Sequence, residues 1–160
     1  MHKTCVSGIA IVGLILALSG QASTSGMTLA ERVRVADFIG VVHIHSVHPS
    51  RDAGKPEEQR QDWFVQTADA VVTETIKGVN MPSHITIQFD HGHAQASPNV
   101  LYDADADYLV FLAFEFDGGY STCVQGQYAI HGATMRDWPG SADPITLEAA
   151  RNSIAKLLPR

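Results

Sequence analysis

The most constraining feature of this sequence is the stretch from residue 108 to 114, Tyr-Leu-Val-Phe-Leu-Ala-Phe, in which every side chain is apolar. Successive residues of a strand point to opposite faces of the sheet, so a strand with one wet face alternates apolar and polar side chains. A strand that is apolar throughout has both faces covered. We therefore expect residues 108 to 114 to form the central strand of a sheet.

Two other segments alternate. In residues 84 to 89 one face carries Ile85, Ile87 and Phe89, and the other carries His84, Thr86 and Gln88. In residues 38 to 47 one face would carry Phe38, Gly40, Val42, Ile44 and Ser46, and the other Ile39, Val41, His43, His45 and Val47. The first pattern predicts a strand with one wet face. The glycine within the second predicts a bulge or sharp bend.

The remaining elements are shorter or less regular. Residues 63 to 77, 120 to 124 and 126 to 131 are typical of strands, with a hairpin turn at residues 117 to 119. Thr28 and Glu31 fit a capping box for a helix from Leu29 to about Ala36. Thr146 can cap a second helix, whose apolar side carries Leu147, Ala150, Ile154, Leu157 and Leu158. Short turns imply an antiparallel sheet and a small closed barrel, in which Val42, Ile87 and Phe111 meet.

The first 22 residues have a positive start, an apolar run from Val6 to Leu18, and small residues ending at Ala22. This order is typical of a cleavable secretory signal peptide, and the run is shorter than the about 20 apolar residues that cross a bilayer. We expect removal of residues 1 to 22, a single domain over residues 23 to 160, and a periplasmic or secreted product without a stable membrane span. Retention of the segment as an uncleaved anchor is the alternative.

Charge and cysteine content limit the partners and the means of stabilisation. The formal net charge of −6 becomes −7 when Lys3 leaves with the signal, and the other basic residues are scattered singly. An acidic surface without a basic stripe argues against nucleic acid as partner and against a polybasic membrane patch. Cys5 also leaves, so Cys123 has no partner for an intrachain disulfide. We expect Cys123 to be buried on a strand.

Four segments together span most of residues 28 to 131 in a particular order and spacing. They are residues 36–42 (ADFIGVV), 72–78 (VTETIKG), 108–112 (YLVFL), and 126–130 after a Gly-Gly-Tyr hairpin. Their arrangement resembles the netrin-like domain, the OB-fold of the tissue inhibitors of metalloproteases, and above all its short exported bacterial relatives, which mostly lack a known function. The resemblance implies a mainly β fold: a five-stranded antiparallel OB-like Greek-key barrel with a short N-terminal helix and a C-terminal helix.

The activity of that family is not implied for this chain. The eukaryotic inhibitors chelate the zinc of the protease through the amine and carbonyl of an N-terminal cysteine. Here the expected mature terminus is Ser23, and the paired cysteines that fix that terminus are absent. The resemblance therefore implies the fold alone.

Histidines are the richest candidates for a metal site, with seven in the mature chain: His43, His45, His48, His84, His91, His93 and His131. His43 and His45 would share a strand face, a geometry that suits Zn or Cu, and His91 and His93 could add ligands from a loop. Metal ligands have to converge, and nothing in the sequence brings that strand and that loop together. A Zn- or Cu-binding periplasmic protein is thus the alternative function, and no metal ligand or cofactor is assigned.

Two further patterns suggest a calcium loop and a hydrolase but do not match the motifs of either. Asp103, Asp105 and Asp107 have the spacing that opens a calcium loop, but Tyr108 stands where Gly is required and Phe114 where Glu is required, which favours a solvated turn. Cys123 with His131, or Ser121 with a histidine, could be nominated for a hydrolase, yet no catalytic motif surrounds them. We assign no catalytic residue. Trp63 and Trp138 are typical of side chains that close the ends of a barrel.

The sequence therefore favours an exported binding or interaction module without catalytic activity, whose partner is a protein or a small molecule. Its contact surface would be the wet strand face together with two long polar loops, residues 49 to 62 and 90 to 105. Long polar loops on a rigid scaffold are where recognition usually resides.

Overall fold

The structure is a computed structural model that describes residues 27–49, 66–89, 102–114 and 119–159, apart from the side chains of residues 123–125. The elements in chain order are α1 (Leu29–Val35), β1 (Phe38–Pro49), β2 (Gln66–Lys77), β3 (His84–Phe89), β4 (Ala106–Phe114), β5 (Tyr120–Ala129), β6 (Thr134–Met135), β7 (Ile145–Thr146) and α2 (Leu147–Ala155). The expected signal segment, the 117–118 turn and most of both long loops lie outside the described residues. No helix in the described ranges is long and apolar enough to cross a membrane.

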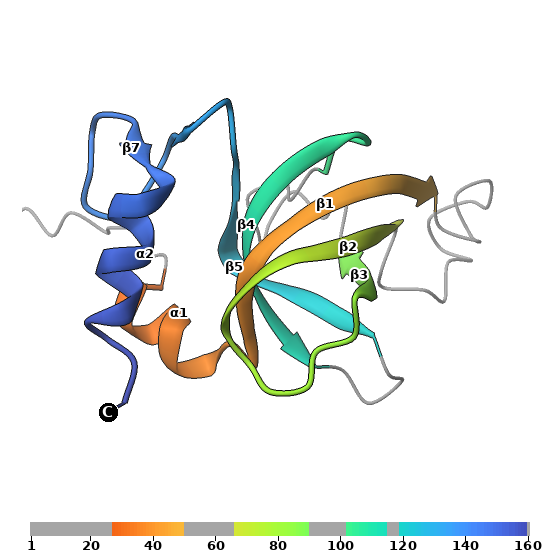
Figure 1. Cartoon of the computed structure of the whole chain (residues 1–160), viewed down its shortest axis with the longest axis horizontal. Coiled ribbons are helices and arrows are strands. Elements are labelled where there is room, and N and C mark those ends of the chain that lie inside the picture. Colours follow the sequence, from red (N-terminus) through yellow and green to blue (C-terminus); the bar gives the residue numbers. More distant parts are fainter. Residues whose placement is uncertain (1–26, 50–65, 90–101, 115–118, 160) are drawn as a thin grey trace, which may run out of the picture.

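Strands β1 to β5 close into a barrel in the order β1-β2-β3-β5-β4, and β4 pairs back onto β1 (Figure 1). This is the expected OB-like Greek-key barrel, flanked by one N-terminal and one C-terminal helix. The expectation of a wholly antiparallel sheet is wrong, because β3 and β5 are parallel, with Ile87 beside Tyr120. A closed ring with an odd number of strands cannot alternate direction at every neighbour, so one parallel pair is unavoidable.

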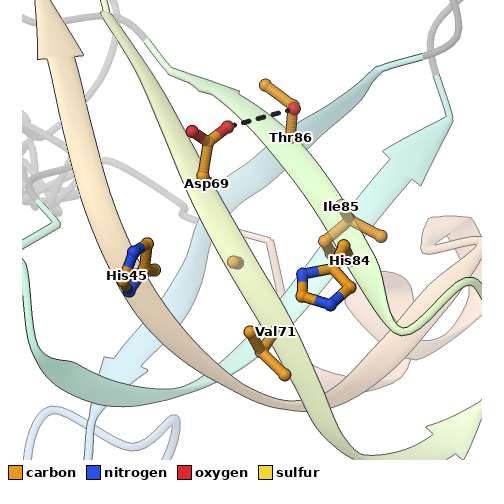
Figure 2. A pocket seen from close by; sticks show the side chains of 7 residues that line it. His45, Asp69, Val71, His84, Ile85 and Thr86 are labelled. Atoms are coloured by element: carbon orange, nitrogen blue, oxygen red, sulfur yellow. Dashed lines mark hydrogen bonds between the residues drawn. The ribbon is translucent and has the colours of Figure 1, made fainter.

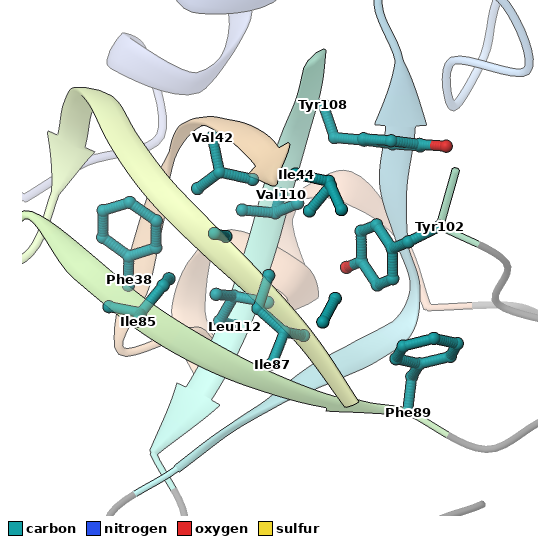
Figure 3. Packing of buried hydrophobic residues seen from close by; sticks show 12 residues of the cluster. Phe38, Val42, Ile44, Ile85, Ile87, Phe89, Tyr102, Tyr108, Val110 and Leu112 are labelled. Carbon is teal, nitrogen blue, oxygen red and sulfur yellow. The ribbon is translucent and has the colours of Figure 1, made fainter. Parts of the chain in front are cut away.

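Strand β4 is covered on both faces from Tyr108 to Leu112, as its apolar sequence predicts, whereas Phe114 at its end is exposed. Tyr108, Val110 and Leu112 point into the barrel, where they belong to a buried cluster with residues of every strand from β1 to β3 (Figure 3). Leu109 and Phe111 point outward into a second cluster beneath the two helices. Val42 and Ile87 thus meet inside the barrel, while Phe111 packs in the other layer, contrary to expectation.

Strand β1 changes its inward face near its middle. Its register against β2 shifts between Ile44 and Ser46, which leaves His45 without a partner in that ladder. Beyond this bulge Val47 packs against the interior cluster and Ser46 faces outward, the reverse of the simple alternation. A β-bulge inserts one extra residue and so exchanges the faces of everything that follows it.

The expected irregularity at Gly40 is confirmed by a register shift between Ile39 and Gly40. A Cβ atom at Gly40 would overlap the ring of Phe38 and the carbonyl oxygen of Glu74. Glycine is therefore required here because the backbone of β2 and the inward ring of Phe38 both approach position 40 closely.

The helices pack together on one side of the barrel and are tied to it by polar contacts (Figure 1). The capping box of Thr28 and Glu31 is confirmed, as is the cap of α2 by Thr146. Arg151 on α2 forms a two-pronged ion pair with Glu74 on β2. Away from the helices, the outer surface of β1 to β3 carries exposed side chains, among them His45, His84 and Thr86.

Candidate functional site

The open surface of the barrel presents two rows of side chains that cross β1, β2 and β3. One row places His43, Val71 and His84 side by side, and the next places Ser46, Asp69 and Thr86 side by side. His45 enters at the bulge between them, and His48 follows Ser46 on the same side. We call this surface the β1–β3 face; its members are His43, His45, Ser46, His48, Asp69, Val71, His84 and Thr86.

Asp69 is the centre of a hydrogen-bond cluster that links all three strands. Its Oδ2 atom lies 2.9 Å from Nε2 of His48 and accepts a hydrogen bond from Oγ of Ser46 at 3.2 Å. Its Oδ1 atom accepts a hydrogen bond from Oγ1 of Thr86 at 3.3 Å. The hydrogen bonds from His48 hold the pKa of Asp69 below its ordinary value, and those from Ser46 and Thr86 act in the same direction, while partial burial opposes them.

Ser46, His48 and Asp69 are the residue types of a hydrolase triad, but their geometry is different. In a triad the imidazole uses one nitrogen for the carboxylate and the other for the serine. Here Nε2 of His48 faces both groups, at 3.0 Å from Ser46 Oγ and 2.9 Å from Asp69 Oδ2. A histidine in this position cannot take the serine proton with one nitrogen while the carboxylate holds the other.

The four histidines of the β1–β3 face fall into two pairs. His43 and His48 each have a carboxylate partner at 2.9 Å, Asp107 and Asp69 respectively. His45 and His84 are exposed, and neither side chain makes a hydrogen bond or ion pair with another residue in the described ranges. The imidazoles of His43 and His48 thus contact carboxylates within the chain, whereas those of His45 and His84 are available to bind a ligand.

A hollow of about 410 Å³ lies between the two unpaired imidazoles. Its lining comes from β1, β2 and β3: His45, Asp69, Ala70, Val71, His84, Ile85 and Thr86. Figure 2 shows His45 on one side and His84 on the other, with Val71 between them and the hydrogen bond of Thr86 to Asp69 beyond. The hollow combines an apolar floor with polar groups at its margins, the arrangement found in small-molecule sites.

The metal site considered from the sequence is not found in the described part of the chain, where no group of three or more His, Cys, Asp or Glu side chains could hold a metal ion. His43 bonds Asp107, Asp103 accepts from the Tyr108 hydroxyl, and Asp105 sits in a turn with a positive φ of 59°. The expected turn is confirmed at residues 104 and 105, while Ala106 and Asp107 already belong to β4. His91 and His93 lie outside the described residues.

The other candidate residues are distributed over separate parts of the fold. His131 follows β5 and is exposed, far along the chain from the β1–β3 face, and Ser121 lies half-buried on β5. The Cys123 side chain and Trp63 lie outside the described residues. Trp138 is buried against Phe111 and Tyr128 in the layer beneath the helices, and so does not close an end of the barrel.

A second hollow, of about 460 Å³, was not expected from the sequence. It is lined by Asp37, Lys77, Gly78, Val79, Met81, Phe114 and Tyr120. Its charged groups are occupied within the chain: the Lys77 ammonium donates to the Val33 carbonyl at 2.8 Å, and the Asp37 carboxylate accepts from the Phe114 amide at 2.8 Å. Exposed Val79 and Phe114 are the signal in the sequence that could have indicated it.

No protein-family model matches this chain, and no curated protein matches it.

Proposed function

We propose that this protein is an exported, non-catalytic binding module that receives a small ligand on the β1–β3 face. The observation that carries the proposal is the hollow of about 410 Å³, whose two flanking imidazoles have no partner within the described ranges. A volume of this order falls in the range of about 300 to 1,000 Å³ typical of ligand sites. Polar side chains that a protein does not use internally are available to fix a ligand.

The β1–β3 face is built on paired strands and not on loops. All the residues that line the hollow sit on strands of a closed barrel, and Asp69 ties those strands together through Ser46, His48 and Thr86. Sites built on strands hold their geometry better than sites built on loops. Binding therefore requires little ordering of the protein, which favours affinity.

Fold-level analogy points to the same surface. OB-folds commonly bind ligands over strands 2 and 3, between the loops that join strands 1 to 2 and 4 to 5. The hollow lies over β2 and β3, with β1 at its margin. One fold hosts many functions, so the shared fold indicates where a ligand binds and not which ligand it is.

The alternatives that the sequence left open have weaker support. A hydrolase would need an activated nucleophile, and the shared Nε2 of His48 does not provide one. A metal carrier would need at least three converging ligands, which the described residues do not bring together. The proposed export rests on the signal-like sequence of residues 1 to 22, and kinship with netrin-like domains rests on the sequence resemblance.

Substitution of the floor of the hollow tests the proposal. Val71→Arg places a long charged side chain in the hollow, while Val79→Arg adds the same charge at a position 89% exposed and outside it. Purified wild-type and variant proteins are incubated with small-molecule extract from the source cells, and retained compounds are identified by mass spectrometry. We expect Val79→Arg to retain the same compounds as wild type and Val71→Arg to lose them. Equal retention by both variants would contradict the proposal.

A further inference from the structure

Two of the four histidines on the β1–β3 face contact a carboxylate and two do not, so protonation of the second pair would add positive charge to the hollow. His43 and His48 each lie 2.9 Å from a carboxylate, whereas His45 and His84 line the hollow without such a partner. Histidine is the side chain whose charge changes between about pH 5 and 8. When all four imidazoles are protonated, the first two neutralise Asp107 and Asp69, and the other two supply positive charge to the hollow.

We propose that the hollow binds the carboxylate of a small monoanionic acid with an apolar body, and that binding is switched on by mild acidification. This inference rests on the proposed function and names the ligand class for the same site. The carboxylate would lie against the imidazole of His45 or of His84, which donates a charge-assisted hydrogen bond when protonated. The apolar part of the ligand would cover Val71, whose side chain lies between the two histidines.

The charged groups around the two imidazoles determine the direction of the pH dependence. From β1 these are His43 and His48, from β2 Asp69, and from β4 Asp107. Asp105 precedes β4, where its amide donates to the Ile44 carbonyl at 2.8 Å. Farther along β2, Glu74 is paired with Arg151. The carboxylates repel an anion, and imidazoles that carry no charge do not compensate for this repulsion.

The same groups favour a monoanion over a more highly charged ligand. Asp69 remains ionised at mildly acidic pH, because the hydrogen bonds that it accepts keep its pKa below the ordinary value of 3.8. The Asp69 carboxylate therefore stays negatively charged at the margin of the hollow. A phosphate dianion would face stronger repulsion from this carboxylate than a monoanion, with the same two imidazoles as donors.

The floor of the hollow selects for the rest of the ligand. Val71 stands between His43 and His84 in the cross-strand row, and neighbouring Cβ atoms in such a row are about 4.5 to 5.5 Å apart. A flat apolar group of the size of one aromatic ring can cover Val71 while its carboxylate reaches an imidazole. Benzoate is therefore a suitable probe, and benzamide is its uncharged counterpart of nearly the same shape.

The experiment is a titration of isotope-labelled protein with benzoate and with benzamide, followed by amide chemical shifts at pH 5.5 and pH 7.5. Carboxylic acids of this kind have a pKa of about 4, so benzoate is anionic at both pH values. We expect benzoate to bind at least tenfold more tightly at pH 5.5, with the largest shifts at residues around the hollow. Benzamide should bind weakly and equally at both values.

Variants connect the effect to the two imidazoles. His45→Gln and His84→Gln should each reduce the pH dependence of benzoate binding, and the double variant should abolish it. His131→Gln removes an exposed histidine elsewhere and should change nothing. Benzoate binding that is absent, or equally tight at both pH values, overturns the carboxylate assignment. If Val71→Arg still abolishes retention of extract compounds in that case, the proposed binding function stands and only the ligand class is wrong.

Discussion

The imidazole Nε2 of His48 lies 2.9 Å from the Asp69 carboxylate. The Ser46 hydroxyl contacts the same nitrogen, at 3.0 Å, and also donates to the carboxylate. A hydroxyl, an imidazole and a carboxylate, the groups found in catalytic triads, therefore form a closed cluster and contact one another. Its effect is to join β1 to β2, and the hydroxyl of Thr86 extends the link to β3.

The first prediction follows from that closed geometry. Ser46 should behave as an ordinary hydroxyl, because the imidazole nitrogen that contacts it, Nε2 of His48, is shared with the Asp69 carboxylate. A fluorophosphonate probe, which labels activated serines, should not modify the protein. Mass spectrometry of the treated protein checks this, and labelling that disappears in Ser46→Ala would contradict the non-catalytic assignment.

The Asp69 cluster should contribute to stability in a pH-dependent way. The folded pKa of Asp69 is lowered from 3.8, so its contribution is present above that value and is lost as the pH falls through the folded pKa. Asp69→Asn should therefore reduce the free energy of unfolding at pH 7 by up to about 1 kcal/mol, the range for exposed pairs. The deficit should shrink at pH 3.

Urea unfolding at the two pH values measures this effect. Asp143→Asn is a matched control, because Asp143 is exposed and its side chain makes no hydrogen bond or ion pair in the described ranges. A deficit of the same size at pH 3 and pH 7 would show that the lost charge is not the cause.

Gly40 should not tolerate a side chain. An added methyl group would overlap the Phe38 ring and the Glu74 carbonyl oxygen, so Gly40→Ala forces strand β1 away from β2 or moves a buried ring. Overpacking of this kind typically costs about 1 to 3 kcal/mol. Thr75 pairs with Gly40 across the ladder and is exposed, so Thr75→Ala should stay within about 0.5 kcal/mol. Equal stability of Gly40→Ala and wild type in urea unfolding would refute the close approach.

Tyr128 should make the protein sensitive to alkali. Burial raises the pKa of the Tyr128 hydroxyl to about 12, and Asp137 adds to the effect while the Arg32 guanidinium opposes it. The folded state therefore holds the neutral phenol above the ordinary pKa of 10.0, and stability falls as the pH rises from that value through about 12. Tyr128→Phe should show a smaller loss of unfolding free energy between pH 9 and pH 11. An identical loss in both proteins would argue against the shifted pKa.

Local sequence signals predicted the elements well because their physical causes are local. The Thr28 and Glu31 capping box depends on residues three apart, and the alternation of His84, Ile85 and Thr86 reports directly on the two faces of one strand. The all-apolar residues 108 to 114 likewise indicated a strand covered on both sides, which holds for residues 108 to 112. Each inference required only the period of the pattern and no knowledge of the neighbours.

The errors arose where several strands act together. Turn lengths suggested antiparallel neighbours throughout, yet β3 meets β5 because the ring has to close. The bulge at His45 reversed the faces of Ser46 and Val47, and no residue there signals a bulge as glycine does at position 40. Phe111 was assigned to the interior because an all-apolar strand does not reveal which face meets which layer.

The candidate site was predicted only in part for the same reason. The wet face of β3, with His84 and Thr86, followed from alternation, and His43 with His45 followed from their spacing. The role of Asp69 did not, because it depends on register: Ser46, Asp69 and Thr86 align only once β1, β2 and β3 are paired. The sequence also did not reveal which histidines contact a carboxylate and which are available to bind a ligand.

The most direct test of the binding assignment is a map of amide chemical shifts on addition of the small-molecule extract from the source cells. We expect the perturbed residues to cluster around Val71 and His84 on the β1–β3 face. Perturbations confined to the second hollow, around Val79 and Phe114, or no perturbation of the β1–β3 face at all, would contradict it.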